Sequence, residues 1–148
     1  MPGAVIVTLP WPDKRLSPNA RLHWRAKVGP KQAARIASQH YALASKGFYS
    51  VRDALKGTEG PIPVAVRFYP PDRRHRDDDN MIGSLKSHRD GIAEVLGVDD
   101  RRFRPHYFFE QPEKPGRIEF EILDTAQSGV KCSNLDSSAV NGLPQWKR

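Results

Sequence analysis

The strongest structural signal in the chain is an amphipathic helix, which the sequence predicts over about residues 81–96. Gly97 follows as a helix terminator, and large apolar residues recur at helical spacing before it: Met81, Leu85, Ile92 and Leu96. A helix with one apolar stripe must bury that stripe against another layer of structure. The chain is therefore expected to form a layered domain around this helix.

Apolar runs predict four strands, and a run of helix-forming residues predicts one further helix. The expected elements are, in chain order, a buried strand at 4–9, an irregular loop at 11–31, a helix at 32–46, a strand at 64–69, the helix at 81–96, a strand at 107–110 and a strand at 117–122. This β-α-β-α-β-β order predicts an α+β domain with one mixed sheet and helices packed on a face. The domain is expected to span residues 1–123, followed by a loose tail at 124–148 that is rich in Ser, Gly and Asn.

The composition indicates a basic protein, which we expect to act in the cytoplasm on a polyanion. Its 148 residues suit one domain, and no apolar run is long enough for a membrane span. The N-terminus lacks the pattern of a secretory signal, and the single cysteine, Cys132, excludes an internal disulfide and a zinc site built from cysteines. The net charge of +7 favours phosphate contacts, although charge alone does not identify a nucleic acid.

An acidic cluster, Asp77-Asp78-Asp79-Asn80, precedes the predicted helix. Adjacent carboxylates repel one another, and a bound Mg²⁺ would relieve that repulsion because hard cations take oxygen ligands. In an extended segment Asp77 and Asp79 point the same way and Asp78 points the opposite way, which favours Asp77 and Asp79 as co-ligands. The alternative is a helix cap, because carboxylates complement the helix dipole and Asp79 or Asn80 makes a good N-cap.

Further polar residues form one stripe on the predicted helix. A rotation of about 100° per residue brings Gly83, Lys86 and Asp90 into line with Asp79. Lys86 is thus a candidate for contact with a substrate phosphate, and Gly83 would leave room for the phosphate backbone. The alternative for Lys86 and Asp90 is an ordinary ion pair four residues apart on a solvated helix face.

Arginines border both acidic segments, before the cluster at 77–80 and after Asp99-Asp100. A metal-dependent phosphodiesterase needs acids to hold metal and guanidinium groups to hold phosphates. The alternative is a set of surface ion pairs beside an ordinary Asp-rich turn. The candidate DNA-binding residues are Arg73, Arg74, Arg76, Arg101 and Arg102 in these runs, with Arg21 and Lys27 in the predicted loop.

Two stretches of the chain resemble the RusA-type Holliday-junction resolvases. Leu9-Pro10-Trp11-Pro12 after the first strand is similar to the start of that family, and so is the later order of a strand, the segment 71–80 (PDRRHRDDDN), a helix and Asp99-Asp100. The resemblance covers about residues 5–123. It implies a small homodimer of mixed α/β structure that binds four-way DNA junctions and cuts them symmetrically, with Mg²⁺ or Mn²⁺ held by three aspartates.

The resemblance also implies roles for single residues. Asp77 and Asp79 match the paired aspartates that hold metal in the family. Asp100 matches the third metal ligand, and the neighbouring Asp99 is the alternative. These three aspartates are the predicted catalytic and metal-binding core.

A lysine on the helix completes the family's site, and Lys86 is the candidate for it. The chain departs from the family pattern here, because Gly83 stands at the position counted directly from the aspartates. Lys86 fits when the spacing is counted back from Asp90. An insertion of about one helical turn near the helix start reconciles the two alignments.

The predicted function is therefore a Mg²⁺-dependent endodeoxyribonuclease that resolves Holliday junctions by paired strand cuts in DNA recombination and repair. Two alternatives remain open. One is a less selective metal-dependent nuclease acting on forks, flaps or RNA. The other is a DNA-binding module without catalysis, whose aspartates only cap a helix or hold a structural ion.

Overall fold

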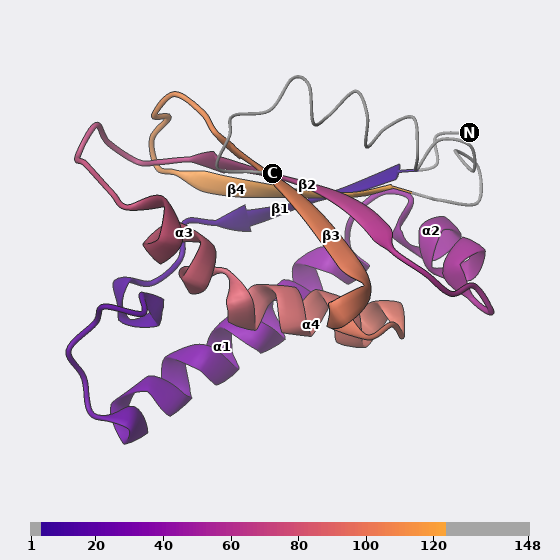
Figure 1. Cartoon of the computed structure of the whole chain (residues 1–148), viewed down its shortest axis with the longest axis horizontal. Coiled ribbons are helices and arrows are strands. Elements are labelled where there is room, and N and C mark those ends of the chain that lie inside the picture. Colours follow the sequence, from indigo (N-terminus) through magenta and orange to yellow (C-terminus); the bar gives the residue numbers. More distant parts are fainter. Residues whose placement is uncertain (1–3, 124–148) are drawn as a thin grey trace.

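Four strands form one mixed sheet in the order β1-β4-β2-β3 (Figure 1). The computed structural model describes residues 4–123, and the tail predicted at 124–148 lies outside the described residues. β4 pairs antiparallel with β1 and with β2, whereas β2 and β3 run parallel. The predicted α+β class with one mixed sheet is therefore confirmed. The strands are β1 (Ala4–Pro10), β2 (Ile62–Tyr69), β3 (Phe103–Phe109) and β4 (Arg117–Leu123).

Helices cover one face of this sheet. α1 (Trp24–Leu43) and α4 (Lys86–Leu96) lie side by side on that face (Figure 1). Strand residues that are fully buried alternate with charged residues, as Val66 does with Arg67 in β2. Arg67 pairs with Glu121 of β4 at 3.0 Å between their side-chain atoms. The prediction of helices packed on one face is confirmed.

The first and third strands form but differ from their predictions, and both lie at an edge of the sheet. β1 was expected to be buried, yet Ile6 is 48% exposed while Val5 and Val7 face the core. The helices cover only one face, so a run of apolar residues does not require burial on both sides. β3 begins at Phe103, before the predicted residue 107, and includes Pro105, which an edge strand tolerates.

α1 begins eight residues before the helix predicted at 32–46, so the predicted loop at 11–31 is wrong in its second half. His23 caps the helix, since its Nδ1 accepts a hydrogen bond of 3.2 Å from the backbone N–H of Arg25. Pro30 lies inside α1, where its φ fits a helical turn although the lost hydrogen bond and the ring cost about 3 kcal/mol. Burial of the apolar residues Ala34 and Ala42 in the same helix helps to offset that cost.

Two short helical segments were not predicted. η1 (Lys14–Leu16) is a 3-10 turn after β1, and α2 (Phe48–Leu55) follows Gly47, which ended the predicted first helix. Phe48, Val51 and Leu55 are buried at helical spacing, so the sequence carried the signal for α2. No helix within residues 4–123 is long and apolar enough to cross a membrane.

The helix predicted at 81–96 is two helices, α3 (Asp78–Ser84) and α4, with Leu85 between them. The Ser84 hydroxyl donates a 2.7 Å hydrogen bond to the Asn80 carbonyl, a contact that bends helices. Gly83 packs against the Pro18 ring, with which an added Cβ would collide. Pro18 therefore fills the space that we expected Gly83 to leave for a phosphate backbone.

α4 packs closely on α1 through Gly91. Gly91 is buried, and a Cβ at this position would collide with the Ser38 hydroxyl and the Arg35 carbonyl of α1. Backbone atoms cannot move aside without shifting the whole helix. Glycine at this position therefore sets the distance between the two helices.

Replacing Gly91 with alanine is expected to destabilise the protein by about 1–3 kcal/mol, because overpacking outweighs the gain of up to about 1 kcal/mol in helix propensity. Urea unfolding followed by circular dichroism measures the change. Gln32→Ala on the exposed surface of α1 is the control and is expected to change stability by less than about 0.5 kcal/mol. A Gly91→Ala protein as stable as the native one would contradict the close packing.

Candidate functional site

The acidic cluster lies at the N-terminal end of α3. Asp77 is the N-cap residue, and its backbone carbonyl accepts hydrogen bonds from the N–H groups of Asn80 and Met81, both 3.1 Å long. Asp78 and Asp79 form the first turn, where carboxylates complement the helix dipole. The cluster therefore starts a helix, as the alternative predicted, but the N-cap is Asp77 and not Asp79 or Asn80, and the Asp77 side chain makes no capping hydrogen bond. The helix begins before Asn80, so the expected strand-like alternation of Asp77 and Asp79 is wrong.

Arg76, which we expected to bind DNA, is held by the protein itself. Its Nη2 donates a 2.9 Å hydrogen bond to the Asp72 carboxylate, and its Nη1 donates to the backbone carbonyls of Asp72 and Arg74 at 3.2 and 3.0 Å. Its guanidinium also lies over the Trp11 ring, 5.4 Å from the centroid. Arg76 therefore orders the loop between β2 and α3, and Arg73 and Arg74 are the exposed cations of this loop.

A hollow of about 500 Å³ lies beside the acidic cluster, and we call it the cluster hollow. Its walls come from the end of β1, from η1 and from the loop leading into α3. Asp77 is one of the lining residues, and its Oδ1 lies 3.3 Å from the Nε2 of His75. The residues lining it include Trp11, Lys14, Ser17, Arg74, Arg76, Asp77 and Asn80.

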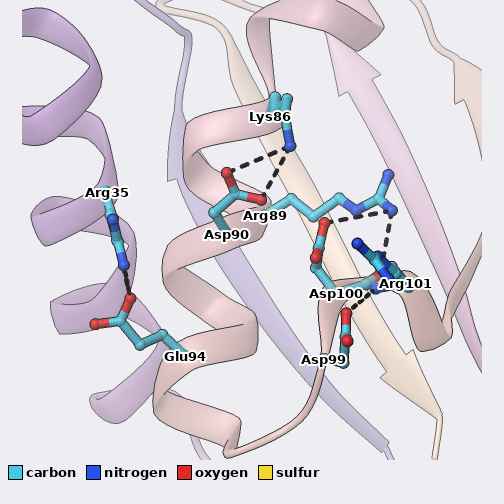
Figure 2. A network of polar contacts seen from close by, with 8 residues as sticks. All are labelled: Arg35, Lys86, Arg89, Asp90, Glu94, Asp99, Asp100 and Arg101. Carbon is cyan, nitrogen blue, oxygen red and sulfur yellow. Dashed lines mark hydrogen bonds and ion pairs between the residues drawn. The ribbon is translucent and has the colours of Figure 1, made fainter. Parts of the chain in front are cut away.

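A second group of charged residues joins α4 to the segment that follows it (Figure 2). Lys86 Nζ lies 3.4 Å from the Asp90 carboxylate, so the alternative of an ion pair four residues apart is confirmed. Arg89 Nη2 donates a 3.1 Å hydrogen bond to the Asp100 carbonyl. The same nitrogen lies 3.8 Å from Asp100 Oδ2, beyond hydrogen-bond distance, so the carboxylate keeps acceptor capacity.

Asp99 and Asp100 occupy different environments although they are neighbours. The Asp99 carboxylate accepts a 2.9 Å hydrogen bond from the Arg101 N–H and so caps η2 (Asp100–Arg102). Asp100 extends toward Arg89 instead (Figure 2). Of the two predicted alternatives, Asp100 has the carboxylate that is not engaged in capping.

These residues line a hollow of about 350 Å³, which we call the α4 hollow. Four carboxylates line it, and one of them, Glu94, is paired with Arg35 of α1 (Figure 2). The Arg35 hydrogen bond lowers the pKa of Glu94. The lining residues that carry charge are Arg35, Lys86, Asp90, Glu94, Asp99 and Asp100.

A third hollow, of about 290 Å³, connects the other two, and we call it the bridging hollow. It shares Ser17 and Ser84 with the cluster hollow, and it shares Lys86 and Asp90 with the α4 hollow. Because neighbouring hollows share lining residues at the end of η1 and on α3 and α4, we call the three together the row of hollows. Lys27, a predicted DNA-binding residue, lines the bridging hollow together with Lys31.

The row places the predicted metal ligands at opposite ends. Asp77 lines the cluster hollow, Asp79 stands in the first turn of α3, and Asp100 lines the α4 hollow. Within residues 4–123, no three acids, histidines or cysteines gather into a group that would hold a metal by itself. The structure thus places Lys86 and Asp100 at the α4 hollow and Asp77 at the cluster hollow, whereas Asp79 lines none of the three hollows.

The remaining predicted DNA-binding residues divide into exposed and engaged cations. Arg21 and Arg101 are exposed. Arg102 is engaged, because its Nε donates a 2.8 Å hydrogen bond to the Gly60 carbonyl and its Nη2 donates to the Thr58 hydroxyl at 3.1 Å. Arg102 thus ties η2 to the turn before β2.

Sequence reasoning missed Arg35, Glu94 and Arg89 as parts of the site. Arg35 and Glu94 are 59 residues apart and meet only because α1 and α4 pack together. Arg89 had a local signal, since it lies one residue from Asp90 in a basic helix segment. Its partner Asp100 is eleven residues away, and no helical spacing predicts that contact.

The fold and the hollows define a small basic α+β protein with acids lining both the cluster hollow and the α4 hollow. No protein-family model matches the chain. An uncharacterized protein from Xylella fastidiosa (strain Temecula1) is 39% identical over 140 residues, which cover 94% of this chain and 82% of the relative. The chain belongs to the same family as that Xylella protein.

His88 anchors the first turns of α4 beneath the charged residues. Its side chain is 5% exposed, and burial lowers its pKa to about 4 from an ordinary value of 6.5, although the Ser84 backbone acts in the opposite direction. The folded protein therefore holds His88 neutral at pH values where the unfolded chain is protonated. Between pH 6.5 and 4 the unfolded state binds more protons, so stability falls as the pH falls.

When the pH falls from 7 to 5, the titration of His88 is expected to lower the free energy of unfolding by about 2 kcal/mol. The His88→Gln protein has no titratable group at this position. Its free energy of unfolding should therefore fall by about 2 kcal/mol less than that of the native protein over the same interval. Urea unfolding at the two pH values measures the difference. Equal pH losses in the two proteins would show that His88 is not held neutral by burial.

Proposed function

We propose that this protein is a Mg²⁺-dependent endonuclease that cuts branched DNA, as the resemblance to the RusA-type resolvases implies. The row of hollows is the observation that carries the proposal. A groove with carboxylates at both ends and lysines along it suits a DNA strand whose phosphates pass beside metal ligands. The net charge of +7 supports binding to that polyanion.

The oxygen donors of the α4 hollow fit Mg²⁺. This ion commonly takes one or two protein carboxylates and fills its other positions with water and phosphate oxygens, so a preassembled group of three acids is not required. Asp100 would hold the ion with Asp90 as its neighbour in the hollow. When bound, the metal would polarise the phosphate and supply an activated water.

The two ends of the row would then have different tasks. Lys86 lies 3.4 Å from the Asp90 carboxylate. It would leave this partner for a substrate phosphate and neutralise the charge of that phosphate. Asp77 and Asp79, which the resemblance assigns to metal, would hold an ion only together with the phosphates of a bound strand. Both carboxylates are exposed at the start of α3, where a cation carried by a phosphate can reach them.

Cutting two opposed strands of a four-way junction needs two sites. A homodimer with twofold symmetry supplies them, because each copy brings one groove to one strand. The exposed cations Arg73, Arg74 and Arg101 would hold the junction arms through their phosphates. We therefore include a homodimer in the proposal.

Incubation of the protein with a synthetic four-way junction and Mg²⁺ is expected to give paired nicks, which denaturing gels detect. Asp100→Asn and Asp79→Asn should each reduce the cleavage rate by roughly 100-fold or more, because each removes a carboxylate that would hold one of the proposed ions. Asp78→Asn is the matched control in the same cluster. It keeps the helix start but has no assigned ligand role, and its rate should change by less than about threefold.

The alternatives give different results in the same assay. Equal cleavage of the junction and a linear duplex at matched salt would show a less selective nuclease. Junction binding that persists in chelator, with no cleavage under Mg²⁺ or Mn²⁺, would replace the proposal with a DNA-binding module. Nicks undiminished in Asp100→Asn would remove Asp100 from the site.

A further inference from the structure

We propose that the cluster hollow receives one unstacked nucleobase of the bound DNA strand and so gives the protein a base preference next to its cleavage site. The inference rests on the proposed function only for the identity of the ligand as DNA. The hollow is about 500 Å³, within the range of about 300–1,000 Å³ that is usual for pockets of small organic ligands. Its volume is therefore sufficient for a flat heterocycle.

The hollow contains a flat surface on which a base would stack. Trp11 lines it and is fixed from the core by Phe68, whose ring meets the indole edge-on at 6.4 Å and 78°. The Arg76 guanidinium lies 5.4 Å from the Trp11 centroid and also lines the hollow. Bases stack on indoles and on guanidinium planes alike, so a base would extend an existing stack.

That flat surface is ordered before any ligand arrives. The Arg76 side chain is 19% exposed, and the Asp72 carboxylate holds it at 2.9 Å. The Asp72 pKa is lowered by hydrogen bonds from the Arg74 backbone and the Arg76 side chain, so Asp72 stays charged and keeps its hold on Arg76. A preordered surface binds a base with little loss of side-chain freedom.

The same hollow offers groups that read the edge of a base. The Asn80 amide lines it, and the amide nitrogen makes only a long 3.4 Å hydrogen bond to Asp77. An Asn side chain has two donor hydrogens and an acceptor oxygen, which can pair with the donor and acceptor groups of one base. At the rim, Lys14 and Arg74 supply cations for the phosphates on either side.

The cluster hollow lies next to the bridging hollow. It shares Ser17 and Ser84 with the bridging hollow, so a strand lying along the row passes its mouth. A branched junction contains nucleotides that have lost a stacking neighbour, and such bases are the least costly to extrude. One base near the crossover would enter the hollow while its phosphates continue toward Lys86.

The test measures binding without cleavage. The full-length protein is titrated, in chelator, into labelled four-way junctions that each lack one base at successive positions near the crossover. The native protein is expected to bind one or two of these abasic junctions roughly 5- to 150-fold more weakly than the intact junction. Trp11→Ala should reduce the ratio of the affinities for the intact and the abasic junction to below about twofold, and it should leave the affinity for the abasic junction unchanged.

Trp24→Ala is the matched control, because Trp24 is 64% exposed and does not line the cluster hollow. This variant should keep the native ratio. Asn80→Ala provides a second variant that does not touch the core, and it should flatten the preference among the four bases at the sensitive position. Circular dichroism checks that each variant is folded.

Several results would overturn the inference. These are equal binding of every abasic junction by the native protein, an unchanged ratio in folded Trp11→Ala, and an unchanged base preference in Asn80→Ala. If the protein cleaves junctions but binds intact and abasic junctions equally well, the proposed nuclease stands and the base pocket alone is refuted. If the protein binds abasic junctions more weakly but cleaves nothing under any metal, the nuclease is refuted and the base pocket is supported.

Discussion

The close packing of α4 on α1 is the contact on which the other parts of the molecule depend. Gly91 lets the two helix backbones approach, and the residues of the α4 hollow lie on these helices or are tied to them. Arg35 reaches Glu94 from α1, and Arg89 holds the Asp100 carbonyl at 3.1 Å. The helix pair lies against one face of the sheet (Figure 1). Any change in helix spacing therefore moves the acids and the cations of this hollow together.

Local patterns predicted most of the fold. The alternating apolar residues of β2 and β4 are buried in the core. So are the apolar helix positions, which are Met81, Leu85, Ile92 and Leu96. The errors arose where contacts distant in the sequence decide the outcome. The bend at Leu85 accompanies the approach of Gly83 to Pro18, and the early start of α1 runs through Pro30. A single window of residues contains neither the Pro18 contact nor the packing that offsets the proline.

The candidate site was predictable only in its local part. The Lys86–Asp90 pair follows from helical spacing, and a helix start at the acidic cluster follows from its composition. The pairing of Arg35 with Glu94 follows from neither, because it exists only in the folded chain. The role of Arg76 was predicted as phosphate binding, yet its hydrogen bonds turn inward to its own loop. A charged run therefore shows which residue types are present, but folding decides which of them remain available to a ligand.

The bend at Leu85 also determines how this region can vary in length. α3 and α4 are separate rods joined at one residue, so an added or deleted residue at the joint re-aims α3 without disturbing the register within α4. The same change inside α4 would rotate Lys86 by about 100° relative to Asp90 and Arg89 and break the network. Leu85 itself is buried in the core, and Gly83 lies against Pro18, so a change in length at the joint keeps the core only if both of these contacts are kept.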